Sequence, residues 1–480
     1  MFISGKTAGD PMYSDARRIG LGLVAAFALL APVGASADGT PLDVAPRDYS
    51  QQAARSSPAW LQDGVIYEIF PRAFSPGGDF AGVTAQLDRL QQLGVNILWL
   101  MPIHPLGKLK GKGTIGSPYA VRDFYGIDPA YGTPTDLHRL VNEAHKRQLK
   151  VIIDIVANHT AWDSVMMAHP DWYTHDAGGH IIPPNPDWTD VADLDYRNAG
   201  LRHYMQDMLV HWIRDFDLDG FRCDVAAGVP TDFWEQARNE LAAIKPDIVM
   251  LAESEQPDLT ARAFDLDYSW NLYNAASAAI LGQGPATAVR EQWQHDAARY
   301  ERGALRLRFS DNHDQDRAIA RFGQPASLAA SALMFTLDGV PLVYNGMEVG
   351  DTAESGAPAL FEKLPILWSI AERRPQYAEA IQQLIAMRRA HAALTSGDLG
   401  WVHNSDEARV LSFTRRSGAE TLLIAINLSN QPFVGVVEAG VVSTTEITPK
   451  PAAAQKGPNG LPALALGAWE YRVFRIQQGT

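Results

Sequence analysis

The chain has 480 residues, of which 46% are hydrophobic and 20% are charged. These proportions are those of an ordinary globular protein, and they exclude a disordered chain. The 41 Lys and Arg residues against 55 Asp and Glu residues give a formal net charge of −14, whereas a protein that binds a phosphate backbone needs a face rich in Lys and Arg. We therefore expect no nucleic-acid partner.

The N-terminal region contains one strongly apolar run, residues 21–33, which follows two arginines and precedes Ala-Ser-Ala at 35–37. The run is too short to span a bilayer comfortably. A basic region, an apolar stretch and an A-x-A site together indicate a signal peptide over residues 1–37. We expect export to the periplasm or the extracellular space, a mature chain that begins at or near Asp38, and no stable membrane anchor. The alternative is an uncleaved anchor, and residues 38–58 are expected to form a linker.

Beyond residue 64, short apolar runs alternate with amphipathic stretches. Eight runs have the length and composition of strands, and most are followed by a stretch with helical periodicity. Strands that alternate with helices in this way predict a parallel (β/α)₈ TIM barrel of the α/β class over residues 59–395. The eight runs are VIYEIF (65–70), VNILWLM (95–101), KVIIDIV (150–156), GFRCDV (220–225), IVMLAE (248–253), AFDLDYS (263–269), LRLRFS (305–310) and VPLVYN (340–345).

Two further regions depart from the alternation. A long stretch rich in Pro, Asp, Trp and Gly lies between the third strand and its helix, and a connection of that length is uncommon without a function. We expect it to form a short excursion over residues 160–198. After residue 395, strand-like runs follow one another without helices. This predicts a C-terminal antiparallel β-sandwich over residues 396–480.

Ionisable side chains stand at four of the predicted strand ends, where the reactive groups of such barrels lie. Arg222 and Asp224 are two residues apart on one strand and therefore share a face. We expect the guanidinium group to lower the pKa of Asp224 and to keep this carboxylate ionised. Glu253 ends the next strand, where like charges from Asp224 and Asp314 should raise its pKa and keep it protonated near neutrality.

One ionised and one protonated carboxyl group about 5–5.5 Å apart are the requirements of a retaining glycosidase, whereas a wider gap admits water and gives inversion. Each residue taken alone is better explained as a salt-bridged barrel residue. Three carboxylates, one arginine and two histidines from four strand ends favour an active site instead.

Five sequence segments lie at or near these strand ends. They are DIVANHT (154–160), VADLD (191–195), GFRCDVA (220–226), LAES (251–254) and FSDNHD (309–314). In order and spacing, four of these segments resemble the four signature regions of the α-amylase family, glycoside hydrolase family 13, and VADLD resembles the fifth. The resemblance covers roughly residues 60–480. It implies that the excursion after the third strand is the domain B of that family.

The resemblance implies a role for each charged residue at the strand ends. It makes Asp224 the nucleophile and Glu253 the general acid/base. Asp314 becomes a third carboxylate, which holds two sugar hydroxyls and favours distortion of the sugar ring. Arg222 is then the residue that orients Asp224.

The same resemblance implies three further contacts to the sugar on the glycone side of the scissile bond. His159 and His313 match histidines that hydrogen-bond its hydroxyl groups, and Tyr119 matches a tyrosine that stacks beneath it. Two departures stand beside these matches. Ala120 occupies a position where the family often has Asp, and the chain lacks the Lys and His that many starch-cleaving amylases have after the nucleophile. These departures weaken a prediction of long-starch specificity.

A calcium ion is a separate question. Asn158 and Asp193 match two ligands of a calcium that joins domain B to the barrel in amylases, and oxygen atoms are the ligands that calcium takes. A third ligand is usually the backbone carbonyl of the missing His. The resemblance therefore leaves two alternatives open, a structural calcium ion or an Asn158 that only hydrogen-bonds the loop. No organic cofactor is expected.

The resemblance predicts a retaining glycoside hydrolase that cleaves α-1,4-glucosidic bonds of starch-type glucans or malto-oligosaccharides. An α-glucosidase, a maltogenic amylase or a transglycosylase on the same scaffold is the alternative, because the signatures do not distinguish these activities. A non-catalytic ectodomain that resembles the family is a more remote alternative. Such chains lose members of the carboxylate set, which this chain retains.

Overall fold

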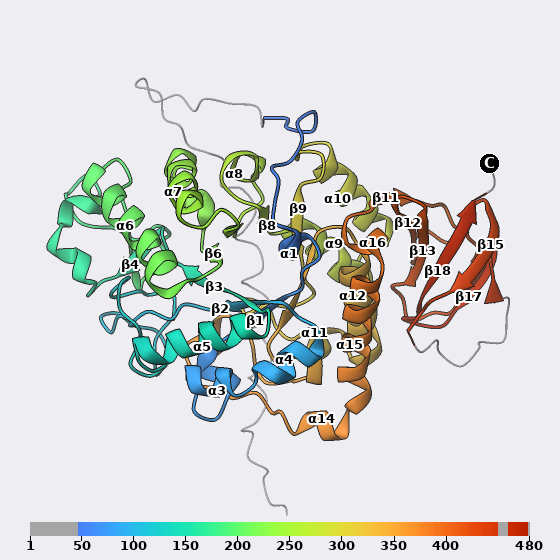
Figure 1. Ribbon diagram of the computed structural model, residues 1–480, viewed down its shortest axis with the longest axis horizontal. Coiled ribbons are helices and arrows are strands. Elements are labelled where there is room, and N and C mark those ends of the chain that lie inside the picture. The colour runs from blue at the N-terminus through green and yellow to red at the C-terminus, as the bar shows by residue number, and fades with distance from the viewer. Residues whose placement is uncertain (1–46, 450–458, 479–480) are drawn as a thin grey trace, which may run out of the picture. The chain divides into compact units, whose positions relative to one another are not determined.

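The computed structural model describes residues 47–449 and 459–478, so the predicted signal peptide lies outside the described residues. Eight parallel strands close into a barrel in the order β1-β10-β9-β8-β7-β6-β3-β2 (Figure 1). Each strand falls within one of the eight predicted runs, which confirms the barrel. The strands are β1 Ile66–Ile69, β2 Ile97–Leu100, β3 Lys150–Ile155, β6 Gly220–Cys223, β7 Val249–Ala252, β8 Leu266–Asp267, β9 Leu305–Arg308 and β10 Val340–Tyr344.

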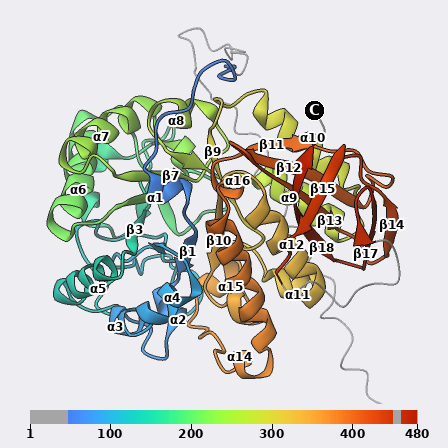
Figure 2. The same ribbon diagram turned by 45° about the vertical axis from the view of Figure 1, so that its right-hand side comes forward.

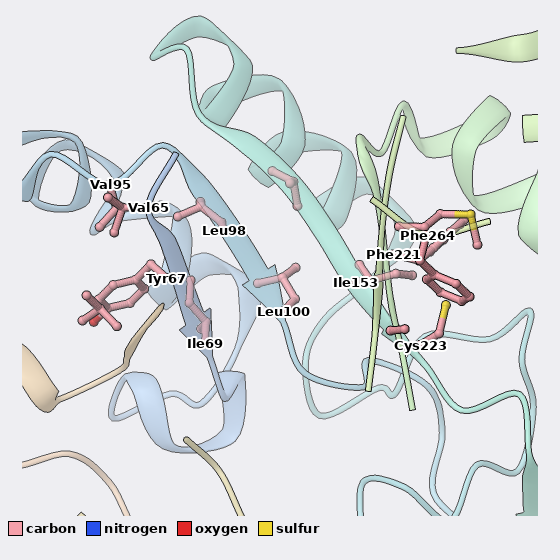
Figure 3. Packing of buried hydrophobic residues seen from close by; sticks show 14 of the residues in the cluster. Val65, Tyr67, Ile69, Val95, Leu98, Leu100, Ile153, Phe221, Cys223 and Phe264 are labelled. Atoms are coloured by element: carbon pink, nitrogen blue, oxygen red, sulfur yellow. The ribbon is translucent and has the colours of Figure 1, made fainter. Parts of the chain in front are cut away.

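Most barrel strands are apolar on both faces, because one face packs inside the barrel and the other packs against the helices. Strand β9 differs, since Leu305 and Leu307 alternate with the buried Arg306 and Arg308. On β1, Tyr67 and Ile69 belong to the cluster that faces the helices, and Figure 3 shows them beside Leu98 and Leu100 of β2. Ile66 alternates with them and belongs to a second cluster inside the barrel. This alternation leaves a few inward positions near the carboxyl ends of the strands for polar side chains.

Helices surround the barrel strands (Figure 2). Their ends follow local sequence signals. Helix α5, for example, starts after Thr133, whose side chain forms a capping box with Asp136. The helices are α1 Ala59–Gln62, α2 Pro71–Phe74, α3 Phe80–Thr84, α4 Leu87–Leu93, α5 Pro134–Lys146, α6 Ala199–Phe216, α7 Thr231–Ile244, α8 Pro257–Arg262, α9 Trp270–Ile280, α10 Thr287–Ala297, α11 Ala318–Phe322, α12 Gln324–Thr336, α13 Ala357–Leu360, α14 Ile370–Arg373, α15 Pro375–Ala390 and α16 Ala392–Thr395.

Three long connections leave the carboxyl ends of β2, β3 and β10. The connection after β3 is the expected domain B, and it contains the antiparallel pair β4 His159–Ala161 and β5 Val191–Asp193. Two 3₁₀ turns, Val165–Ala168 and Pro170–Trp172, lie between these strands. The connection after β2, residues 101–133, is also long, and the sequence analysis did not single it out.

The C-terminal region forms two antiparallel sheets in the orders β11-β12-β13-β18-β15 and β14-β17-β16. Side chains from both sheets, such as Leu423, Phe433 and Leu464, share one buried cluster. Phe413 and Ile424 of the larger sheet belong instead to the cluster of the barrel helices. This arrangement confirms the predicted C-terminal antiparallel region. The strands are β11 Asp398–Trp401, β12 Val410–Ser417, β13 Glu420–Asn427, β14 Phe433–Val436, β15 Val441–Glu446, β16 Asn459–Gly460, β17 Ala463–Leu466 and β18 Tyr471–Gln478.

The segment before α1 was expected to belong to a linker, but its described part is hydrogen-bonded to the barrel. The amide of Ala54 donates to the carbonyl of Arg302 at 3.0 Å, and the amide of Arg302 donates to Gln52 at 2.9 Å. The Ser57 hydroxyl lies 3.0 Å from the carboxylate of Asp265. Spacing alone did not indicate this pairing. Within the described residues, no helix is long and apolar enough to cross a membrane.

Candidate active site

The centre of the site is Arg222 on β6, whose side chain is fully buried at the carboxyl end of the barrel. Its Nη1 lies 2.8 Å from Oδ1 of Asp224 and 2.9 Å from Oδ1 of Asp154. Its Nη2 lies 3.0 Å from Oε2 of Glu253. One guanidinium group therefore contacts carboxylates from three neighbouring strands, β3, β6 and β7.

Aromatic rings enclose this guanidinium group. Its carbon lies 5.2 Å from the ring centroid of Trp99, 5.7 Å from that of Tyr119 and 5.6 Å from that of Tyr268. Burial opposes the positive charge, but Asp154 and the other carboxylates outweigh burial and hold the pKa of Arg222 well above its usual value. The arginine is therefore a permanent positive charge in a buried site.

The two carboxyl groups on β6 and β7 have raised pKa values. Burial raises the pKa of Asp224 to about 6, although Arg222 acts in the opposite direction. Burial raises the pKa of Glu253 to about 7, and the Asp224 and Asp314 charges add to the increase. The expected direction for Glu253 agrees with the structure, but the expected low pKa of Asp224 was wrong. Burial of the carboxylate outweighs its arginine partner.

The backbone after Asp224 holds Glu253 in place. Val225 has φ 43° and ψ 47°, in the left-handed region, which a β-branched residue rarely adopts. This conformation turns the amide of Val225 toward Glu253, and the N–H donates to Oε2 at 2.9 Å. Such a backbone conformation costs about 1–3 kcal/mol and persists where the surroundings enforce it, often at active sites.

A second group of residues faces Arg222 from β2, β3 and β9. The hydroxyl of Tyr119 lies 3.1 Å from Oδ2 of Asp154 and 2.7 Å from Nε2 of His313. The rings of Tyr119 and His313 stack at 5.3 Å with 22° between their planes. Oδ2 of Asp314 lies 3.3 Å from Nε2 of His313, and the Asp314 side chain keeps 35% exposure.

Glu68 on β1 completes this group, and the sequence analysis missed it. Its carboxylate is fully buried and hydrogen-bonds Nδ1 of His313. Burial lowers the pKa of His313, but Asp314 and Glu68 outweigh burial and raise it to about 9. A lone carboxylate in the apolar run VIYEIF was the only sequence signal for Glu68. Asp154 was noted at a strand end but was given no role, although it contacts both Arg222 and Tyr119.

His159 lies on the domain B side of the site. It is 4% exposed, and burial lowers its pKa to about 4, so its ring is neutral near neutral pH. The edge of Trp188 contacts it at a centroid distance of 5.7 Å. Ala120, the departure noted in the sequence, is buried in an apolar cluster with Ala161 and Val191. The alanine therefore fills a packing position beneath domain B.

Asn158 and Asp193, the candidate calcium ligands, both lie at the β4–β5 pair. A Cβ atom at residue 228 would lie only 2.1 Å from Oδ1 of Asn158, so this oxygen rests against the backbone of Gly228. The Thr174 side chain hydrogen-bonds the Asp193 carboxylate, whose pKa burial raises. Calcium takes six to eight oxygen ligands, and the described part of the chain offers no group of three or more His, Cys, Asp or Glu that could hold a metal ion. A calcium ion here would therefore depend on the Asn158 amide oxygen and on backbone carbonyls beside Asp193.

The fold and the site together define a class of protein, a (β/α)₈ barrel with a cluster of carboxyl groups at the carboxyl ends of its strands. A model of the α-amylase catalytic domain matches residues 46–189 and 185–398. Because the match covers more than half of the chain, the chain belongs to the α-amylase family. It is a glycoside hydrolase of the α-amylase type, and this type acts with retention of configuration.

Individual relatives agree with this assignment. A cyclomaltodextrinase of Geobacillus thermopakistaniensis is 26% identical in an alignment of 423 residues that covers 78% of this chain and 70% of that protein. The structure of a noncanonic maltogenic α-amylase of Thermotoga neapolitana is 32% identical with a TM-score of 0.75, over 86% of this chain and 96% of that one. An α-amylase structure from Lactobacillus plantarum is also 32% identical with a TM-score of 0.75, over 86% and 99%.

Proposed function

We propose that this protein hydrolyses α-1,4-glucosidic bonds of malto-oligosaccharides and starch-type glucans, with Asp224 as nucleophile and Glu253 as general acid/base. The observation that carries this assignment is the contact of both carboxyl groups with one guanidinium group, that of Arg222. Two carboxyl groups that contact the two terminal nitrogens of one planar guanidinium group are held close together, as retention of configuration requires. The assignment of the proton to Glu253 is supported by the direction of the pKa shifts, since burial raises the pKa of Glu253 to about 7 and that of Asp224 to about 6.

The proposed reaction has two steps. In the first, Asp224 attacks the anomeric carbon while Glu253 donates its proton to the departing glycosidic oxygen, and a β-linked glycosyl-enzyme forms. In the second, the Glu253 carboxylate removes a proton from water, and the oxygen of that water attacks the anomeric carbon and displaces Asp224. The product keeps the α configuration, and both carboxyl groups return to their starting states.

The other residues of the site would bind the sugar that Asp224 attacks. Tyr119 offers an aromatic face, and the protonated ring of His313 and the Asp314 carboxylate offer hydrogen bonds of opposite polarity. His159 contributes a neutral ring from domain B. Because Arg222 contacts Asp154, Asp224 and Glu253 but lies beneath them, fully buried, we assign it to orientation of the carboxylates and not to contact with the substrate.

The α-1,4-glucan substrate is supported by the activities for which the relatives are named, which include a cyclomaltodextrinase and maltogenic amylases. The remaining candidates on this scaffold are α-glucosidase and transglycosylase activities. Product analysis with maltotriose, starch and pullulan distinguishes them.

Domain B is proposed to be joined to the barrel by direct contacts and not through calcium. The amide of Leu194 donates to the carbonyl of Asn158 at 3.2 Å. The hydroxyl of Tyr196 donates to the carbonyl of Ala157 at 2.8 Å. The amide of Ala161 donates to Val121 at 2.9 Å. Export with cleavage near Ala37 also stays a proposal, supported by the N-terminal sequence alone.

The test of the two roles uses Asp224→Asn and Glu253→Gln, each with α-glucosyl fluoride, whose fluoride leaves without a proton. Both variants should lose turnover of malto-oligosaccharides by several orders of magnitude. Glu253→Gln should still form the glycosyl-enzyme from the fluoride, and azide should restore turnover as α-glucosyl azide. Asp224→Asn should form no covalent adduct. Asp88→Asn, in which the exposed carboxylate on α4 is lost, is the matched control and should behave as the wild type.

Mass spectrometry of the trapped peptide decides the assignment. A glucosyl adduct on Glu253, or a β-configured first product from the wild type, would contradict the proposed roles. Equal activity of all three variants would contradict the site itself.

A further inference from the structure

The connection between β2 and α5 contains a loop, residues 107–116, which we call the bridging loop. Its base is a β-bridge between Leu106 and Val121, and the amide of Gly107 donates to the carbonyl of Ala120 at 2.8 Å. The loop therefore returns to the chain beside Tyr119, which contacts Arg222 at the centre of the site.

One end of the bridging loop is attached to domain B. The amide of Lys108 donates to the Asp163 carboxylate at 3.0 Å. The ammonium group of Lys110 lies 3.4 Å from the ring centroid of Trp162. A cation at this distance from an aromatic face is attracted to it. The backbone and a side chain of the loop thus contact the same short segment of domain B.

A third contact ties the loop to residues beside His159. The ammonium group of Lys112 lies 2.9 Å from Oδ1 of Asp190 and 3.2 Å from the carbonyl oxygen of Asp187. Asp190 is buried, with 5% exposure, and its charge acts on the pKa of His159 in the site. The lysine therefore supplies the counter-charge for a buried carboxylate at the edge of the active site.

The other end of the bridging loop is attached to the connection after β10. The amide of Thr114 donates to Glu362 at 3.0 Å, and the amide of Ile115 donates to the carbonyl of Phe361 at 3.0 Å. Gly113 has φ +64°, and a Cβ atom there would lie 2.4 Å from Cβ of Phe361. This close approach requires glycine. Phe361 in turn packs in the cluster that includes Tyr119.

The order of the strands places the bridging loop relative to Glu253. Domain B follows β3, and the second attachment follows β10, so the loop extends across the barrel mouth above β1 and β2. In this closed barrel β1 is the fourth strand from β7 in either direction. The loop therefore lies on the side of the mouth opposite Glu253.

A general acid must lie within hydrogen-bonding distance of the oxygen that it protonates. The leaving group therefore extends toward Glu253, and O4 of the attacked sugar points to the opposite side. In an α-1,4-glucan the next sugar of the glycone is attached to O4. A long glycone would therefore extend toward the side of the barrel mouth where the bridging loop lies.

We infer that the bridging loop closes the glycone side of the active site, so that the enzyme attacks α-glucans from their non-reducing ends and releases short sugars. This inference rests on the proposed function and specifies its substrate. Leaving groups of any length fit, because the loop does not cross the Glu253 side. Internal bonds of a chain are excluded, because a glycone longer than a few sugars meets the loop.

The test compares maltoheptaose with maltoheptaose whose non-reducing end carries a 4,6-O-ethylidene group, with products separated by chromatography. The wild type should cleave the blocked substrate at least about 100-fold more slowly in kcat/KM, as expected when a buried site excludes a bulky group. Replacing residues 108–114 by Gly-Ser-Gly should raise the ratio of blocked to free cleavage at least about tenfold. Longer products should then appear from amylose.

Two further variants keep the test independent of loop shortening. Lys110→Ala/Lys112→Ala removes the side-chain contacts to domain B and should raise the same ratio. Lys108→Ala is the matched control, because its contact to Asp163 is made by the backbone N–H, which the substitution retains. It should show the wild-type ratio. Hydrolysis of α-glucosyl fluoride, which carries no glycone beyond one sugar, should be unchanged in Lys108→Ala and should persist in the other variants, which reports an intact site.

The outcomes separate the inference from the function on which it rests. Equal cleavage of blocked and free maltoheptaose by the wild type would overturn the inference while leaving the proposed function standing. An unchanged ratio of blocked to free cleavage in both loop variants would also overturn the inference. A wild type that hydrolyses neither the maltoheptaoses nor α-glucosyl fluoride would overturn the proposed function, and the inference with it.

Discussion

Replacing Glu68 by glutamine tests the electrostatics of the site. The glutamine has the same shape and keeps an oxygen that accepts the Nδ1–H of His313, so the change removes mainly a buried charge. In the native chain, Asp314 and Glu68 overcome burial and raise the pKa of His313 from 6.5 to about 9. One pKa unit corresponds to about 1.4 kcal/mol, so protonated His313 makes a net contribution of about 3 kcal/mol, and this sets the scale of the loss expected in Glu68→Gln.

The sign of the pH dependence follows from linkage. A histidine whose pKa is raised in the folded state contributes stability that is fully present below pH 6.5 and is lost as the pH rises through about 9. Glu68→Gln should therefore lower the melting temperature most near pH 6 and much less near pH 9.5. Differential scanning fluorimetry of both proteins across this range measures the difference.

Glu348→Gln is the matched control for this experiment. Glu348 is also buried, and it contacts Arg89 at 2.8 Å and the Tyr67 hydroxyl at 2.5 Å. The usual pKa values of Arg and Tyr side chains already lie above 9.5, and those of Arg89 and Tyr67 are raised from there. Neither partner therefore titrates between pH 6 and 9.5. The destabilisation of this variant should be the same at both pH values. An equal loss at both pH values in Glu68→Gln as well would refute the coupling between Glu68 and His313.

Three other predictions follow from the site and the termini. The plot of kcat/KM against pH should be a narrow bell, because activity needs Asp224 ionised above about pH 6 and Glu253 protonated below about pH 7; a flat profile from pH 5 to 8 would contradict these assignments. Excess chelator should leave the melting temperature unchanged, because no calcium ion is expected to stabilise the folded state. Removal of a bound ion would lower the melting temperature by several degrees, so a decrease that Ca²⁺ reverses would show a calcium site at Asn158 and Asp193. Intact mass of exported protein should correspond to a chain that begins at or near Asp38, and a mass that includes residues 21–33 would exclude cleavage.

The barrel could be predicted because its strands are buried on both faces and therefore read as continuous apolar runs. The positions of Arg222, Asp224 and Glu253 followed from strand alternation and from the rule that barrel sites lie at carboxyl ends. The pKa of Asp224 could not be predicted in the same way. Spacing along a strand identifies a neighbouring arginine, but it does not indicate how completely water is excluded.

Contacts between distant segments were also beyond the sequence. Glu68 is 245 residues from His313 along the chain, and no spacing rule joins them. The bridging loop has three lysines within five residues, a pattern that indicates an exposed polar turn when it is read alone. Its attachments to domain B and to Phe361 depend on the fold of both neighbours. The segment around Ala54 was taken for a linker for the same reason.

Because Arg222 is shared by Asp154, Asp224 and Glu253, electrostatics restricts the order in which substitutions can accumulate during evolution. Loss of the arginine first would leave buried carboxylates without a partner, and breaking a buried pair in this way costs about 3–5 kcal/mol. A descendant that abandons catalysis would have to replace carboxylates before the arginine. Inactive homologues that arose from such a chain should therefore retain the arginine after a carboxylate has gone, and the reverse combination should be rare.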